Sequence, residues 1–245
     1  MIPIAPAQFT LGCQQGDDNC ESDEIPHQVK IPSFFVSKYP ITNKQYAVFL
    51  NAQHQHKSIT GKHWVQVKAE DSDSHLVLKQ GVYLVEPRFE QFPVIEVSWV
   101  GAVKYAQWLS SITHKHYHLP TEDQWEAMAR ANYDISCIDN SRCRTVKQLL
   151  MQRQALQPVG SGMSNALGVS DLLVNNWEWT CSNYKQADVA SRSVCSQSSL
   201  WDSHRSIKGC SWQSNFWECR FSNRAHQDVW YQNHQTSFRL VRENK

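Results

Sequence analysis

Apolar and polar positions alternate over much of the first forty residues, which is the pattern of strands buried on one face. Such runs cover Ile2–Leu11, Gln28–Ile31 and Phe34–Tyr39. A loop rich in acidic residues, 16–24, separates the first run from the second. We therefore predict strands over these three ranges, joined by an acidic loop and a short turn.

Three later segments repeat apolar residues at helical spacing instead. The first helix is predicted to begin after Thr42, because Thr42 and Gln45 have the spacing of a capping box. A second helix is expected to start near Ser98. The third should open after Thr121, which forms a second capping-box pattern with Gln124.

The remaining segments are polar or irregular. A hairpin is predicted at 79–81, inside the polar stretch 51–92, and the basic segment 142–157 favours a solvated surface helix over a nucleic-acid contact. From residue 160 onward, short Trp-rich pieces separated by Asn, Ser and Gly indicate loops and short strands. No repeat or linker divides the chain, so we expect a single domain over 1–245.

Composition narrows the class of protein. The 245 residues are 41% hydrophobic and 19% charged, as in globular proteins, and the net charge is +1. This balance lacks the basic excess of non-specific nucleic-acid binders. No apolar run approaches ~18 residues, so no membrane span is expected. The N-terminal residues do not resemble a signal peptide, and we therefore expect a cytoplasmic location.

Cysteine and tryptophan are both abundant. The chain has eight Cys and ten Trp. Without an export signal the Cys are expected to be mostly buried or loop thiols, although an even count would also suit disulfides. No C-x-x-C pair is present, which disfavours a zinc ribbon. Buried indoles should find hydrogen-bond partners for their N–H groups.

Several blocks along the chain together resemble one known family. They are Pro3–Gly12, Pro26–Val29, Ile41–Leu50, Pro93–Leu109, His118–Arg130, Asn165–Thr180, Lys208–Trp212, Cys219–Arg224 and Phe238–Leu240. In this order and spacing they resemble the formylglycine-generating enzyme, or sulfatase-modifying factor, family. The resemblance implies an α+β fold, the formylglycine-generating-enzyme variant of the C-type lectin fold, which is rich in loops with little regular secondary structure.

The resemblance also indicates where a reaction would take place. Active members bind copper(I) with two Cys and oxidise a client Cys to formylglycine. Ser211 matches the Ser of the motif that precedes this pair, Ser214 stands at the first Cys position and Cys219 at the second. A hydroxyl is a poor ligand for soft copper(I). Cys219 and Ser211 remain the candidate catalytic residues, and copper is expected only if the chain is an oxidase, with Cys210 as a displaced ligand.

A structural calcium ion is the second implication of the resemblance. Its ligands would be the Asp171 and Glu178 carboxylates and the Val174 and Asn176 carbonyl groups, a donor set that suits calcium. Val174 replaces a family Gly, a residue that often has a positive φ, which Val resists. A hydrogen-bonded carboxylate pair without metal is the alternative.

A separate feature of this chain is the run of alternating histidines His114, His116 and His118. In an extended segment the three would lie on one face, where they could bind zinc or nickel. Three collinear side chains suit a tetrahedral site poorly, so surface or packed histidines are the expected state.

We expect a binding or accessory protein that has lost the oxidase and recognises a protein or peptide through the surface Ser211–Arg239. Aromatic side chains mixed with polar groups are typical of recognition surfaces. The candidate contact residues are Trp212, Phe216, Trp217, Trp230 and Tyr231. One alternative is a copper-dependent formylglycine-generating oxidase. A third is an iron-dependent enzyme like the family's sulfoxide synthases, whose histidine ligands come partly from an additional helical domain that we do not recognise in these 245 residues.

Overall fold

The computed structural model describes residues 1–14, 19–130, 152, 155–185, 188–195 and 204–243. The helices among them are α1 (Asn43–Gln53), η1 (Pro87–Phe89), α2 (Trp99–Thr113), α3 (Glu122–Arg130), η2 (Ala190–Ser193) and η3 (Phe216–Glu218), of which the η elements are 3-10 helices. The strands are β1 (Ile2–Ile4), β2 (Ala7–Leu11), β3 (His27–Ile31), β4 (Phe34–Val36), β5 (Leu76–Lys79), β6 (Val82–Val85), β7 (Tyr117–His118), β8 (Trp177–Asn183), β9 (His204–Gly209), β10 (Ala225–Asp228), β11 (Thr236–Ser237) and β12 (Val241–Glu243).

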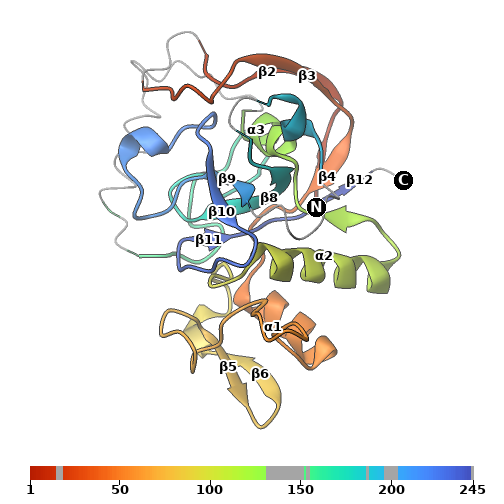
Figure 1. Cartoon of the computed structure of the whole chain (residues 1–245), viewed down its shortest axis with the longest axis vertical. Coiled ribbons are helices and arrows are strands. Elements are labelled where there is room, and N and C mark those ends of the chain that lie inside the picture. Colours follow the sequence, from red (N-terminus) through yellow and green to blue (C-terminus); the bar gives the residue numbers. More distant parts are fainter. Residues whose placement is uncertain (15–18, 131–151, 153–154, 186–187, 196–203, 244–245) are drawn as a thin grey trace.

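One four-stranded sheet joins the two ends of the chain. Its order is β1-β4-β12-β7, and all of its neighbours run antiparallel. Val36 lies opposite Ile2 on one side and Val241 on the other. Figure 1 shows β12, close to the C-terminus, beside β4. The sheet therefore closes only when segments more than two hundred residues apart pair with each other.

A second four-stranded sheet, of order β10-β9-β8-β11, carries the C-terminal half of the fold. β8 and β9 pair antiparallel with Trp177 opposite Gly209, and β11 runs parallel to β8. The register shifts between Trp179 and Asn183. The chain beyond residue 160 is thus more regular than its Asn, Ser and Gly content suggested, because two strands of six and seven residues pair across it.

The predicted helix starts are confirmed by their caps. Thr42 accepts from the Gln45 N–H while the Gln45 side chain accepts from the Thr42 N–H at 2.9 Å, which completes a capping box. Thr121 and Gln124 repeat this exchange before α3. Ser98 caps α2 through its hydroxyl. These side chains satisfy N–H groups that have no partner within a helix.

Strand and turn predictions hold with corrections. The first predicted strand splits into β1 and β2 around Pro6, and the third stops at Val36 instead of Tyr39. Proline has no N–H to donate, so it interrupts the ladder. The hairpin at 79–81 is confirmed between β5 and β6, where Gln80 and Gly81 both have positive φ. The basic segment 142–157 falls mostly outside the described residues.

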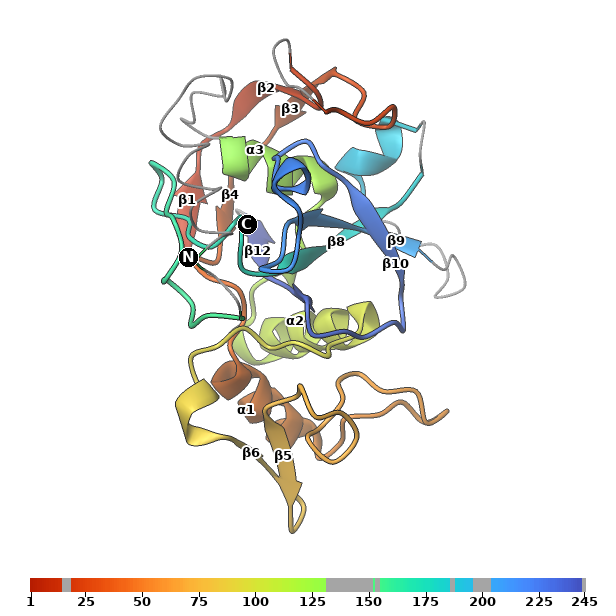
Figure 2. The same cartoon turned by 90° about the vertical axis from the view of Figure 1, so that its left-hand side faces the viewer.

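Two apolar clusters hold the elements together. The larger lies among α1, α2, β6 and the second sheet, and the smaller lies between the first sheet and α3. Figure 2 shows α1 and the β5–β6 hairpin below α2, with both sheets above it. Some buried indoles find acceptors as expected, since Trp99 donates to the Thr180 carbonyl and Trp179 to that of Val97, whereas the buried Nε1 of Trp212 has no partner among the described residues. Within the described part of the chain, no helix is long and apolar enough to cross a membrane.

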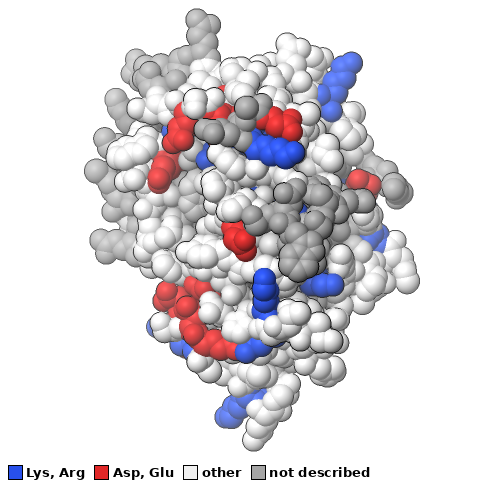
Figure 3. Space-filling model, in the orientation of Figure 1, with Lys and Arg blue, Asp and Glu red and all other residues white. Residues whose placement is uncertain are grey.

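Charged side chains are unevenly spread on the face drawn in Figure 3. Lys and Arg stand mostly apart from one another, whereas several Asp and Glu gather at the lower left, over the loops that precede β5 in Figure 1.

Candidate functional site

The segment that matches the family's copper site begins where β9 ends. Gly209 has a φ of 92°, and a Cβ there would lie 2.9 Å from the Leu172 carbonyl oxygen, so the position requires glycine. Cys210 and Ser211 follow and are fully buried. The Ser211 N–H donates to the Ser214 hydroxyl at 3.1 Å. The oxygen that replaces the family's first sulfur therefore takes part in a backbone turn.

The Ser211 hydroxyl is held from two sides. It donates to Gln235 Oε1 at 2.9 Å and accepts from the Gln213 N–H at 3.1 Å. Among the described residues no histidine or carboxylate is hydrogen-bonded to it. A serine nucleophile requires an adjacent base, so this geometry favours a structural role for Ser211.

Cys219, the second family position, forms a disulfide with Cys210. The two sulfurs are 2.07 Å apart, and both residues are almost entirely buried. Cys210 Sγ also accepts from the Val174 N–H at 3.1 Å. Because a disulfide sulfur is not a thiolate, neither residue offers the ligand that copper(I) prefers in this state. Together with Ser214, the residues present do not fit the two-thiolate copper centre.

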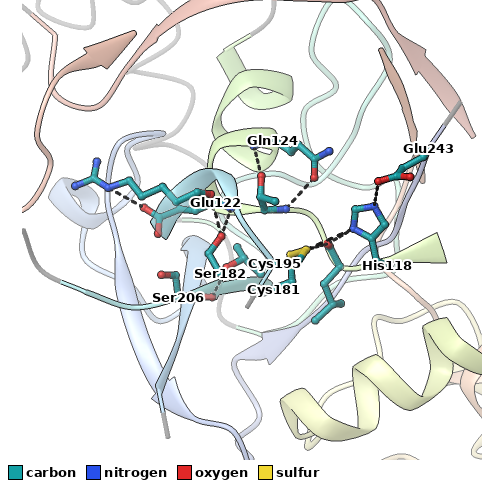
Figure 4. The surroundings of a disulfide bond; sticks show 12 residues. His118, Glu122, Gln124, Cys181, Ser182, Cys195, Ser206 and Glu243 are labelled. Carbon is teal, nitrogen blue, oxygen red and sulfur yellow. Dashed lines mark hydrogen bonds and ion pairs between the residues drawn. A yellow bond between two sulfur atoms is a disulfide. The ribbon is translucent and has the colours of Figure 1, made fainter. Parts of the chain in front are cut away.

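A second disulfide, Cys181–Cys195, ties β8 to the segment after η2. Figure 4 shows it beside His118, whose Nδ1 lies 3.8 Å from Cys195 Sγ, and Glu243 contacts the other ring nitrogen of His118 at 3.8 Å. Burial lowers the pKa of His118, so this imidazole is neutral at physiological pH. On the far side of the disulfide, Ser182 accepts from the Glu122 N–H at 3.0 Å.

The expectation that the cysteines are mostly thiols is therefore wrong for the described part of the chain. Cys13 and Cys20 form a third disulfide in the acidic N-terminal loop, and all six described cysteines are paired. Cys137 and Cys143 lie outside the described residues. The expectation was an inference about the compartment, whereas pairing depends on geometry, and the three pairs have Cα separations of 4.7–6.0 Å, within the range of disulfides.

The first of the expected calcium carboxylates, Asp171, is fully buried and accepts from backbone donors. Gly160 and Gly162 direct their N–H groups at its two oxygens, the latter at 2.7 Å. Val174, three residues later, has a φ of 70°. The positive φ of the family's glycine is thus kept although the residue is Val, at a steric cost that the surrounding packing must offset.

The second carboxylate, Glu178, is paired with a guanidinium. Arg239 Nε and Nη2 donate to its two oxygens at 2.6 Å each, and Trp125 Nε1 donates to Oε2 at 2.7 Å. Glu178 and Arg239 are both fully buried. A cationic side chain thus already neutralises the carboxylate that calcium would need, and in this arrangement Asp171 and Glu178 do not fit a shared calcium ion. The carbonyl groups of Val174 and Asn176 stay a prediction as calcium ligands.

A buried ionic network around α3 was not recognised from the sequence as a unit. Glu122 contacts Arg224 through both of its oxygens, and Arg224 also reaches Asp23 Oδ2 at 3.3 Å. One turn later Glu126 contacts Arg130 at 2.7 Å and Lys208 at 3.1 Å. The signal was available, since acidic residues on one helix and Arg or Lys in distant polar blocks need partners if they are buried.

The electrostatic state of Glu126 follows from its surroundings. Burial by itself raises the pKa of its carboxyl, but the Lys208 ammonium, the Arg130 guanidinium and the Gly12 N–H outweigh burial and lower the pKa to about 2. The Glu122 carboxyl behaves similarly, with Lys208 and other cations lowering its pKa against burial. These charges hold α3 to the second sheet and the N-terminal strands.

The alternating histidines do not form one extended face. His114 is the left-handed C-cap of α2, and only His118 belongs to a strand, β7. His116 and His118 lie near Glu243, while His114 is not part of this group. The extended segment that a three-histidine face would need is absent because the helix continues to Thr113, and the histidines are at the surface or partly packed, as expected.

The five candidate contact residues differ in exposure. Phe216, Trp217 and Tyr231 are 40%, 56% and 54% exposed, whereas Trp212 and Trp230 are partly buried. Trp230 packs against the larger apolar cluster, and its ring lies 5.0 Å from the Lys62 ammonium group. Phe216 and Trp217 project from η3, directly before Cys219.

Comparison with solved structures places this arrangement in one class of fold. The structure of PvdO from Pseudomonas aeruginosa aligns over 99% of this chain and 93% of its own, with a TM-score of 0.74 and 21% identity. Treponema denticola variable protein 1 aligns with a TM-score of 0.72 and 17% identity, over 100% and 95% of the two chains. The chain thus has the loop-rich α+β fold of formylglycine-generating-enzyme-like proteins. Residues 1–244 match the sulfatase-modifying factor enzyme 1-like domain, and the chain belongs to that family.

The proteins whose sequences this chain resembles have different names and activities. The serine/threonine-protein kinase Pkn1 of Chlamydia trachomatis is 26% identical over the whole of this chain, which spans only 38% of the kinase. The formylglycine-generating enzyme of Thermomonospora curvata is 24% identical over 77% of this chain and 72% of the enzyme. An inactive Cα-formylglycine-generating enzyme 2 from mouse is 25% identical over 76% and 70% of the two chains.

Proposed function

We propose that this chain is a binding member of its family, without copper oxidase activity, that holds a protein or peptide ligand at the surface Ser211–Arg239. The observation that carries the proposal is the state of the two family metal positions. Ser214 belongs to a backbone turn, and Cys219 is joined to Cys210 by a disulfide. The oxidase needs two soft thiolates, and this pair of positions offers none.

Three exposed aromatic side chains support the binding role. Phe216, Trp217 and Tyr231 bring large rigid rings to solvent, and such rings contribute disproportionately to protein recognition. Membership of a family that also includes an inactive enzyme is consistent with a fold retained for something other than oxidation.

Loss of the oxidase is tested by its product. The purified chain, with and without a mild reductant, is incubated with copper(I), air and a cysteine-containing peptide, and the peptide is analysed by mass spectrometry for aldehyde. We expect none in either state. Aldehyde that depends on Cys219, as judged with Cys219→Ala, would refute the proposal.

The binding role is tested with peptides selected from a random displayed library. Their affinity is then measured by fluorescence anisotropy for the wild type, Trp217→Ala and Tyr231→Ala. We expect at least a tenfold loss for the two variants, and no change for Ile59→Ala, which removes a fully exposed apolar side chain elsewhere. Equal binding by the wild type and both aromatic variants would contradict this surface.

A copper oxidase remains the second candidate because the two sulfurs of Cys210 and Cys219 are adjacent. Reduction of this disulfide would place two thiols side by side, which is the donor type that copper(I) prefers. Stoichiometric copper(I) binding by the reduced chain, lost in Cys210→Ala, would favour this candidate. The chain's sequence offers no comparable support for the iron-dependent alternative.

The disulfides also bear on location. Disulfides persist in oxidising compartments and are rare in the cytosol. We therefore propose an oxidising compartment in place of the cytoplasmic location expected from the sequence, on the basis of the three described disulfides. Alkylation of the protein in its native cells, before any reduction, would label these cysteines if they were thiols.

A further inference from the structure

Three potential metal ligands from distant segments meet at the edge of the surface Ser211–Arg239, to which one of them, His234, belongs. They are Asp73, from the turn before β5, Glu96, just before the Ser98 cap of α2, and His234, in the loop between β10 and β11. One ligand atom from each lies within 4.8 Å of the other two. His234 Nδ1 is 3.2 Å from Asp73 Oδ2. Figure 3 shows acidic side chains gathered over the loops that precede β5.

The backbone fixes Glu96 within this group. Its N–H donates to the Asn233 carbonyl at 3.0 Å, so it is tied directly to the residue before His234. Its carbonyl accepts from the Gln66 N–H at 3.0 Å and from the Gln232 side chain at 3.2 Å. The segments that carry Glu96 and His234 are therefore held together whether or not an ion is bound.

Within the described part of the chain, no donor or cation pairs with the Glu96 carboxylate. The residue is 2% exposed, and the charged groups that act on it are the carboxylates of Asp71 and Asp73. A buried carboxylate without a donor or cation is costly in a folded protein. The neighbouring Asp71 and Asp73 carboxylates add to this cost, because they repel the ionised form of Glu96. A bound cation would remove this cost.

His234 directs its Nδ1 at the Asp73 carboxylate. Its Nε2 lies 3.1 Å from Gln213 Oε1, which also accepts from the Gln235 side chain at 2.7 Å. An amide oxygen only accepts, so Nε2 carries the proton in neutral His234. Nδ1 then has a lone pair directed at Asp73. This is the arrangement of metal-binding histidines, whose second nitrogen donates to an oxygen of the protein.

We propose that Asp73, Glu96 and His234 bind one divalent first-row transition-metal ion such as Zn²⁺ or Mn²⁺. Two carboxylates and one imidazole suit these ions better than calcium, which takes oxygen ligands. The Asp73 and His234 side chains are 55% and 35% exposed, so one side of the ion would face solvent and could accept water or a ligand donor. The inference does not depend on the proposed binding function.

Two other metal-like groups among the described residues lack these features. In the first, His116 and Glu243 are 60% and 41% exposed, and it contains no buried unpartnered carboxylate. In the second, His118 accompanies two cysteines that are already joined in a disulfide. The first group supplies a matched control, because removing His116 abolishes the competing site and leaves the proposed one intact.

The test uses the full chain, stripped with chelator and titrated with Zn²⁺ by calorimetry and with Mn²⁺ by loss of the free-ion paramagnetic resonance signal. We expect one saturable equivalent, at least tenfold weaker in Asp73→Asn, Glu96→Gln and His234→Gln and unchanged in His116→Ala. Binding of Zn²⁺ should also shift the His234 Nδ1 nitrogen resonance.

Several results would overturn the site. One is the absence of saturable binding of either ion, and another is binding that persists in Glu96→Gln but disappears in His116→Ala. Asp73→Asn changes only a half-exposed side chain, so it keeps the test decisive even if a core variant fails to fold.

Discussion

The buried pair Glu178–Arg239 gives the sharpest test of how this fold is held together. Both side chains are fully buried, and the carboxylate accepts three hydrogen bonds, two from Arg239 and one from Trp125. Glu178→Gln keeps the shape but removes the charge that compensates the guanidinium. Breaking a buried ion pair by removing one partner costs about 3–5 kcal/mol.

The expected loss is large compared with the whole stability of a domain, about 5–15 kcal/mol. Urea unfolding followed by tryptophan fluorescence should show it as a lower midpoint with an unchanged slope. A loss of ~3 kcal/mol also lowers the melting temperature by about 6–12 °C in a chain of this size. The matched control is Glu90→Gln, which breaks the exposed pair with Lys44 and should cost less than about 1 kcal/mol.

The buried pair also leads to a prediction about calcium. If Arg239 neutralises Glu178 as the structure shows, chelator should leave the melting temperature of the wild type unchanged. A double variant, Glu178→Gln with Arg239→Met, should recover part of the stability because no buried charge is left unpaired. The reasoning fails if Glu178→Gln unfolds within 1 kcal/mol of the wild type, or if chelator destabilises the wild type but not Asp171→Ala.

Two further predictions concern acid and reductant. The pKa of Glu126 in the folded protein is about 2, below its ordinary value of 4.5. Its ionised form therefore stabilises the fold above pH ~5. This contribution to the free energy of unfolding, about 3 kcal/mol, is lost as the pH falls toward 2. Urea midpoints at pH 6 and pH 3 should therefore differ more for the wild type than for Glu126→Gln, and equal differences would contradict the assignment. Replacing Cys181 and Cys195 by Ala should cost about 3 kcal/mol, given the sequence separation of 14. Reductant should then destabilise this variant less than the wild type, and an identical response would show that the bond does not form.

The local features of the fold were readable from the sequence because they depend on neighbouring residues. Thr42 and Thr121 cap helices through residues three positions away, and Gln80-Gly81 forms the predicted turn. The positive φ typical of the family glycine is present at Val174 although Val resists that conformation, so this position was not readable from the sequence. The family and fold followed from the order of such local blocks.

The site was less predictable because its groups come from distant segments. Arg239, the partner of Glu178, is 61 residues away along the chain. Cys195, the partner of Cys181, is 14 residues away, and η2 lies between them. Sequence spacing does not show which buried carboxylate has a guanidinium opposite it. The group of Asp73, Glu96 and His234 was missed for the same reason, since no two of its members belong to one motif.

The position of β12 has a consequence for synthesis. This strand lies between β4 and β7, so the sheet that contains the first strand of the chain stays split until residues 241–243 have been made. Long-range pairing of this kind slows folding, because the intervening chain must first be brought to closure. A nascent chain halted before residue 241 would expose two open strand edges, and we expect it to be a target for chaperones or proteases instead of a shorter stable protein.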